Sequence, residues 1–123
     1  MTHRLACCLV IASLALAPRS SAADPGIQAV YDTVDAVEIK NHDLAGGNIH
    51  ALVVVRGIRT GGSVPSTTSF DFGTNKDMAT RCERLAVIAM SKPGKYQFGI
   101  GSDAAGGNAD GGHGDCELIL VAN

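Results

Sequence analysis

The chain has 123 residues, with 10 lysines and arginines against 12 aspartates and glutamates and a formal net charge of −2. This slight acidic excess argues against nucleic acids and anionic membranes as partners, because both attract clustered basic side chains. The aromatic residues are two tyrosines and three phenylalanines, with no tryptophan, so a core must be built mainly from Val, Ile, Leu and Ala.

The first 23 residues are predicted to be a cleaved export signal. A short basic start, His3 and Arg4, precedes an apolar run over 5–17, and small residues follow. A transmembrane anchor would need about 20 apolar residues, and this run is shorter. The two cysteines in this segment lie too near the start for a lipoprotein signal. We therefore expect cleavage after Ala22 or Ala23.

The mature chain, 24–123, is expected to be a single small β-rich domain with one helix. Two basic residues leave with the signal, so 8 basic side chains remain against 12 acidic ones. Two cysteines also remain, Cys82 and Cys116, and a pair of thiols in an exported protein predicts one disulfide. A redox pair would need a C-x-x-C spacing, which these cysteines lack.

Three strands are expected before the helix. The stretch 29–40 is ambiguous, because its apolar residues alternate as in a strand but also recur at a helical spacing; its β-branched content favours a strand. Residues 48–58 contain an apolar, β-branched run that is typical of a central strand. Residues 67–72 alternate and place Phe70 and Phe72 on one side.

A helix is expected over 75–91. Thr74 and Asp77 have the spacing of a capping box, in which a hydroxyl accepts a hydrogen bond from a backbone N–H and a carboxylate reaches back to the cap residue. Apolar residues then recur at helical spacing, which places Cys82 on the buried face. The turn signal at 93–94 ends the helix.

Two closing strands are expected at 95–100 and 116–121. The glycine- and aspartate-rich run 101–114 between them is typical either of a hairpin loop or of an oxygen-rich calcium loop, and we favour the hairpin loop. The G-x-G at 99–101 does not predict a dinucleotide site, because nothing after it can sustain the helix that such a site needs.

This element order resembles the OB-fold, a small five-stranded barrel. A more particular resemblance is to the binding (B) subunits of bacterial AB5 toxins, which are exported OB domains. The stretch 78–90 (MATRCERLAVIAM) looks like their central helix, and a short turn at 92–94 and two strands follow it, as in that family. The resemblance covers the C-terminal half of the chain and the overall order of elements.

The resemblance implies an α+β protein, a small five-stranded OB-like β-barrel with one helix between strands 3 and 4 and one disulfide. It also implies glycan binding and assembly into a ring of copies. Arg81 and Arg84 are expected on the outer side of the helix, where they would face acidic groups of a neighbouring subunit, and they are candidate interface residues.

Candidate catalytic and metal-binding residues give weak signals. His42, His50 and His113 lack the i, i+4 spacing of a helical zinc pair, so we interpret them as polar surface or loop residues. Ser63 lacks the second glycine of a G-x-S-x-G nucleophile elbow and is interpreted as a loop serine.

An acidic stretch carries the remaining candidate catalytic groups. Asp32, Asp35 and Glu38 are interpreted as a solvated acidic face rather than as the paired carboxylates of a glycosidase.

We therefore expect a secreted or periplasmic, non-catalytic binding module for a glycan or a protein surface, without cofactor or metal. No nucleic-acid partner and no membrane span are expected, and the oligomeric state is left open. The alternative is a secreted or envelope structural protein or inhibitor that acts on one protein partner. A small hydrolase is third.

Overall fold

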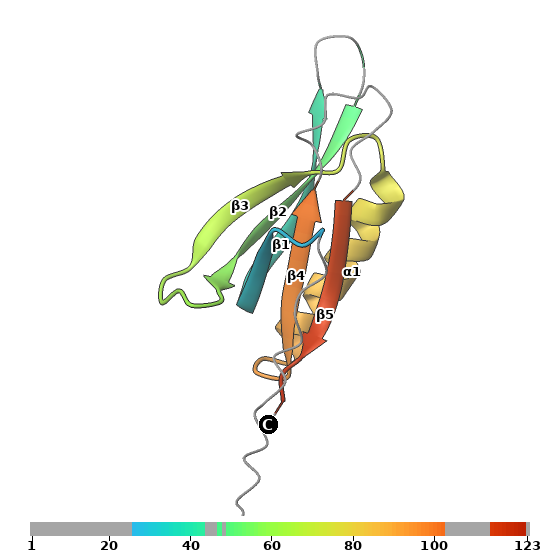
Figure 1. Ribbon diagram of the computed structural model, residues 1–123. Coiled ribbons are helices and arrows are strands. Elements are labelled where there is room, and N and C mark those ends of the chain that lie inside the picture. Colours follow the sequence, from blue (N-terminus) through green and yellow to red (C-terminus); the bar gives the residue numbers. More distant parts are fainter. Residues whose placement is uncertain (1–25, 44–46, 48, 103–113, 123) are drawn as a thin grey trace, which may run out of the picture.

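The computed structural model describes residues 26–43, 47, 49–102 and 114–122, and these residues form one five-stranded sheet and one helix (Figure 1). The stretch left ambiguous at 29–40 is a strand, and the element order agrees with the sequence prediction. The elements are β1 (Ala29–Asp43), β2 (Ile49–Arg59), β3 (Ser66–Asp71), α1 (Lys76–Ser91), β4 (Tyr96–Ser102) and β5 (Gly114–Leu120).

The sheet is antiparallel throughout and has the order β3-β2-β1-β4-β5. β1 therefore lies at the centre, and β3 and β5 form the two edges. Among the described residues these edge strands do not pair with each other, so the sheet stays open. The five antiparallel strands and the position of the helix are confirmed, whereas the expected closure into a barrel is not.

The helix packs on one face of the sheet and lies behind β4 and β5 in Figure 1. Side-chain burial alternates along β2. Ala51, Val53 and Val55 are fully buried, while Leu52 and Val54 between them are only partly buried. Burying a Val or Leu side chain stabilises the fold by about 1.5–3 kcal/mol. A shift of the pairing by one residue would turn these side chains to the other face of the sheet, so their burial determines the register of β2. The helix contributes Ala79, Cys82, Ala86 and Ala89 to the core.

Strand β1 is irregular near its middle. Register shifts between Tyr31 and Thr33 and between Val34 and Ala36 mark β-bulges, which bend and twist a strand. Gly57 in β2 lies opposite this bend, and a Cβ there would collide with the carbonyl oxygen of Thr33. A glycine is therefore required where the two strands approach so closely.

Strand β4 is buried on both faces from Phe98 to Ser102. One face meets the helix, and the segment 26–28 runs across the other, in front of β4 in Figure 1. A Cβ at Gly101 would collide with the backbone carbonyl of Gly26. The glycines of the G-x-G therefore allow the backbone of the segment 26–28 to pack closely on the backbone of β4. This packing explains the motif without a dinucleotide site.

The helix begins one residue later than the capping-box pattern suggests. Asn75 is the N-cap, and its side-chain oxygen accepts a hydrogen bond from the Met78 N–H at 3.1 Å. The predicted capping box of Thr74 and Asp77 is therefore wrong, because Asn75 is at least as good a cap as threonine and already satisfies one of the free N–H groups of the first turn. The helix ends at Ser91 before the expected turn.

The predicted disulfide is present. Cys82 of α1 and Cys116 of β5 are bonded, with their Cα atoms 5.5 Å apart, and both are buried. The bond fixes the middle of the helix to an edge strand of the sheet.

Candidate functional site

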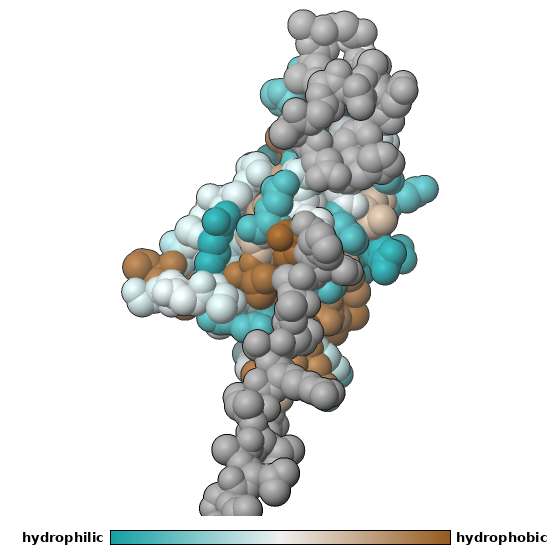
Figure 2. Space-filling view, in the orientation of Figure 1, coloured by the Kyte–Doolittle hydropathy of each residue, from teal (hydrophilic) through white to brown (hydrophobic). Residues whose placement is uncertain are grey.

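The outer face of the sheet, defined as the face of β1–β3 turned away from α1, carries most of the clustered polar groups. Figure 2 shows hydrophilic (teal) and intermediate (white) residues beside hydrophobic (brown) ones over this region. Because antiparallel partners point to the same side, the register defines three rows across the strands. These rows are Lys40–Leu52–Asp71, Glu38–Val54–Ser69 and Ala36–Arg56–Thr67.

A groove of about 210 Å³ lies on this face. Its charged residues are Glu38, Lys40 and Arg56, and the Lys40 ammonium lies 3.3 Å from the Glu38 carboxylate. We call it the β1–β2 groove, and it combines an apolar floor with a charged rim. It is lined by Ala36, Val37, Glu38, Lys40, Val54, Arg56 and Thr67.

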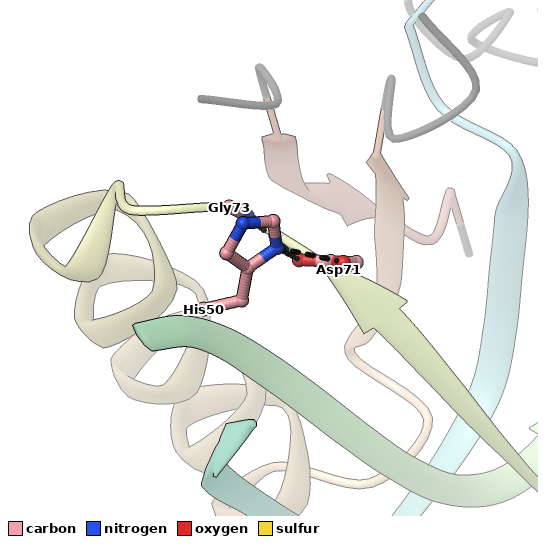
Figure 3. A network of polar contacts seen from close by, with 3 residues as sticks. All are labelled: His50, Asp71 and Gly73. Atoms are coloured by element: carbon pink, nitrogen blue, oxygen red, sulfur yellow. Dashed lines mark hydrogen bonds and ion pairs between the residues drawn. The ribbon is translucent and has the colours of Figure 1, made fainter. Parts of the chain in front are cut away.

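A polar network lies beside the groove, where β2 begins and β3 ends (Figure 3). Nδ1 of His50 is 3.0 Å from each carboxylate oxygen of Asp71, and the Gly73 N–H donates to the same carboxylate at 2.8 Å. An ionised carboxylate only accepts hydrogen bonds, so Nδ1 of His50 carries the proton and donates it. The network fixes both the imidazole ring and the turn that leads into α1.

The carboxyl group of Asp71 is held in its ionised form. Partial burial raises its pKa, but the hydrogen bonds from His50 and Gly73, with the positive charges of His50 and His42, outweigh this effect. The net pKa lies below the ordinary value of 3.8. Asp71 is therefore an acceptor and a fixed negative charge at neutral pH, not an acid catalyst.

A second polar cluster connects the centre of the sheet. The carboxylate of Asp32 accepts hydrogen bonds from the Thr60 hydroxyl at 2.8 Å and from the Gln97 side-chain amide at 2.6 Å. These contacts join β1, the end of β2 and β4. Asp32 therefore has a structural role, while Asp35 is exposed and Glu38 belongs to the groove.

The other residues singled out from the sequence are spread over the molecule. Cys82 and Cys116 are joined in a structural disulfide. Arg81 and Arg84 are exposed on α1, across the sheet from the β1–β2 groove. Ser63 is exposed in the connection between β2 and β3, as expected of a loop serine.

The structure brings His42 and His50 together, which the sequence interpretation missed. They are direct partners in the β1–β2 ladder. The signal was their placement at the facing ends of two consecutive strands, whereas the zinc-pair criterion applied to the sequence covers helical spacings only. His113 and most of the glycine-rich run lie outside the described residues, as does the expected export signal.

No protein family, curated protein or solved structure matches this chain. The geometry of the site is therefore the basis for assigning a function. In the described part of the chain, no helix is both long and apolar enough to cross a membrane. The same residues contain no group of three or more His, Cys, Asp or Glu side chains placed to hold a metal ion.

Proposed function

We propose that the protein is a non-catalytic binding module that contacts a protein surface through its β1–β2 groove. The observation that carries this proposal is the groove itself, with its apolar floor and its rim of Glu38, Lys40 and Arg56 on an exposed sheet face. A central apolar contact surrounded by charged groups is the usual anatomy of a protein–protein interface.

The size of the groove favours a protein partner over a small ligand. Pockets that enclose small molecules commonly measure about 300–1,000 Å³ and are lined largely by apolar and aromatic side chains. This groove is smaller, at about 210 Å³, and no aromatic residue lines it. Of the aromatic side chains of the described sheet, Tyr31, Phe70 and Phe98 are buried, and the partly buried Tyr96 lies on β4, outside the groove. A glycan partner would therefore have no ring to stack on here.

The strand order supports a related proposal, that the sheet is an OB-like fold left open between β3 and β5. Pairing these two edges would give a five-stranded barrel with the helix between strands 3 and 4. Proteins with the OB-fold commonly bind their ligands on the face of strands 2 and 3 and on adjacent loops. The β1–β2 groove, which includes residues of β1, β2 and β3, lies on the corresponding surface.

Export to the periplasm or the cell exterior is part of the same proposal. Disulfides persist mainly in oxidising compartments, so the Cys82–Cys116 bond supports it. Cleavage of the signal peptide at 22–23 is tested by the mass of the mature amino terminus.

Assembly of several copies is proposed through the exposed side of α1. Val87 and Ile88 are 51% and 40% exposed there, close in sequence to Arg81 and Arg84. An apolar centre flanked by arginines suits a contact between subunits. Light scattering of the wild type and of Val87→Asp tests it, and a wild type that is monomeric at all concentrations would contradict it.

The groove is tested with a charge-reversed variant and a matched control. Proteins of the envelope fraction of an exporting host and a glycan array are screened for binding, and each ligand found is retested by surface plasmon resonance. We expect Arg56→Glu to weaken binding of a protein ligand at least tenfold, because it places a like charge beside Glu38. Lys92→Glu, an equal change of charge at an exposed residue just beyond α1 and outside both the groove and the proposed subunit contact, should leave it unchanged.

Two results would contradict the proposal. One is a protein ligand that binds Arg56→Glu as well as the wild type. The other is a glycan as the only ligand found, which would instead favour the sugar-binding role implied by the toxin-subunit resemblance.

A further inference from the structure

The hairpin of β1 and β2 places two imidazoles opposite each other on the outer face. His42 and His50 are directly paired in the ladder, and Ala51 next to His50 is fully buried on the helix side. Because side chains alternate along a strand, His50 must point to the outer face. Its partner His42 points the same way, with its Cβ about 4.5–5.5 Å from that of His50.

This spacing suits two nitrogen ligands of one metal ion. Metal–imidazole bonds are about 2.0–2.1 Å long, so the two coordinating nitrogens must lie about 3 Å apart. Side chains whose Cβ atoms are about 5 Å apart reach this separation by small rotations towards each other. His42 is exposed and is therefore free to make this adjustment.

The ring of His50 is already oriented as a ligand. Its Nδ1 donates to both oxygens of Asp71, at 3.0 Å each, and its Nε2 lies on the side of the ring away from that carboxylate (Figure 3). Histidines that bind metals almost always donate their second ring N–H to a carboxylate or carbonyl, which fixes the tautomer and raises the basicity of the coordinating nitrogen. Asp71 is held in turn by the Gly73 N–H.

We infer that His42 and His50 form a binding site for a divalent late first-row metal ion, Zn²⁺ or Cu²⁺, in which Asp71 orients His50. Imidazole is a preferred ligand of both ions, and affinity rises towards Cu²⁺ along this series. The chain supplies two ligands, and water or a donor from a bound partner completes the coordination. The site stands independently of the proposed protein partner, because both ligands belong to this chain.

The surrounding charges do not oppose a cation at this position. The negative charge of Asp71 lies against His50. Lys40, the neighbouring cation on the same face, is paired with Glu38 at 3.3 Å.

The test is calorimetric titration of the full chain with Zn²⁺ and, separately, with Cu²⁺, at a pH where imidazole is neutral. We expect the wild type to bind one ion more per chain than the double variant His42→Ala/His50→Ala. Sites elsewhere in the chain, including any at His113, persist in the double variant and cancel in this comparison. Electron paramagnetic resonance should show two nitrogen ligands for the Cu²⁺ that the wild type binds and the double variant does not.

The role of Asp71 is tested by a positioning variant. Asp71→Asn should weaken the site about 10–100-fold, the usual effect of removing the carboxylate behind a ligating histidine. Asp43→Asn is the matched control: it removes a carboxylate next to His42 in sequence but on the opposite side of the strand, and it should change the affinity less than twofold. Circular dichroism shows whether each variant folds.

Three results would overturn the inference. The wild type and the double variant bind equal numbers of ions, or the Cu²⁺ spectrum shows one nitrogen, or Asp43→Asn weakens binding as much as Asp71→Asn. The last result would mean that Asp71 contributes only its charge.

Discussion

Removal of the Cys82–Cys116 disulfide should strongly destabilise the protein. The cysteines are 34 residues apart, and in the chain-entropy model a cross-link over this separation stabilises the fold by about 3.8 kcal/mol at 25 °C. Small domains are typically stable by only about 5–15 kcal/mol, so the bond accounts for a quarter or more of the total. A loss of this size lowers the Tm of a domain of about 100 residues by about 15–30 °C.

The measurement is urea unfolding of the wild type and of Cys82→Ala/Cys116→Ala, with circular dichroism as the signal of unfolding. Both sulfurs are buried, so the alanine variant also loses packing, and the free energy of unfolding should fall by at least 3 kcal/mol. Reduction of the wild type separates the two effects, because a reductant removes the cross-link but leaves the side chains in place. A difference below about 1 kcal/mol between oxidised and reduced wild type would refute the reasoning from chain entropy.

Three further predictions concern the backbone and the polar network. Gly57→Ala should destabilise the fold by about 2 kcal/mol or more, because the added Cβ would collide with the β1 backbone. Gly26→Ala is the control and should change the Tm little, because no atom lies closer than 3.8 Å to a Cβ at that position. Equal effects of the two substitutions on thermal unfolding would contradict this account. Asn75→Ala should lower the unfolding free energy by about 1 kcal/mol, and Thr74→Ala should lower it clearly less. A larger loss for Thr74→Ala than for Asn75→Ala would instead support the capping box of Thr74 and Asp77. The pKa of Asp71 is lower in the folded state than in the unfolded state. The ionised carboxylate therefore contributes its full share of the unfolding free energy above the unfolded pKa, and this share is lost as the pH falls from about 5 towards 2. In metal-free buffer, the difference in unfolding free energy between the wild type and Asp71→Asn should shrink over that range, and a difference independent of pH would disprove it.

The parts of the fold that depend on local pattern could be predicted from the sequence. The 3.6-residue periodicity around Cys82 defined the helix and its buried face, and alternation around Phe70 defined β3. The disulfide followed from the count of cysteines in the expected mature chain. The helix and strand patterns each lie within a short stretch of sequence, and the cysteine count needs no knowledge of the three-dimensional structure.

The remaining features depend on contacts between distant residues. Closure of a barrel requires β3 to meet β5, and neither strand carries a local signal for its partner. The bulges in β1 shift its register against β2, so the alternation in 29–40 was incomplete and looked partly helical. The same long-range dependence concealed the histidine pair, because the register between β1 and β2 cannot be read from the residues around each histidine.

The covalent ring between residues 82 and 116 encloses β4, the strand that is paired on both sides and buried on both faces. Local opening is therefore least favourable there and most favourable at β3, which pairs with a single neighbour and is far from the cross-link. Amide hydrogen exchange should accordingly be slowest in β4 and fastest in β3, so the sheet would open first at β3 while β4, β5 and α1 stay joined.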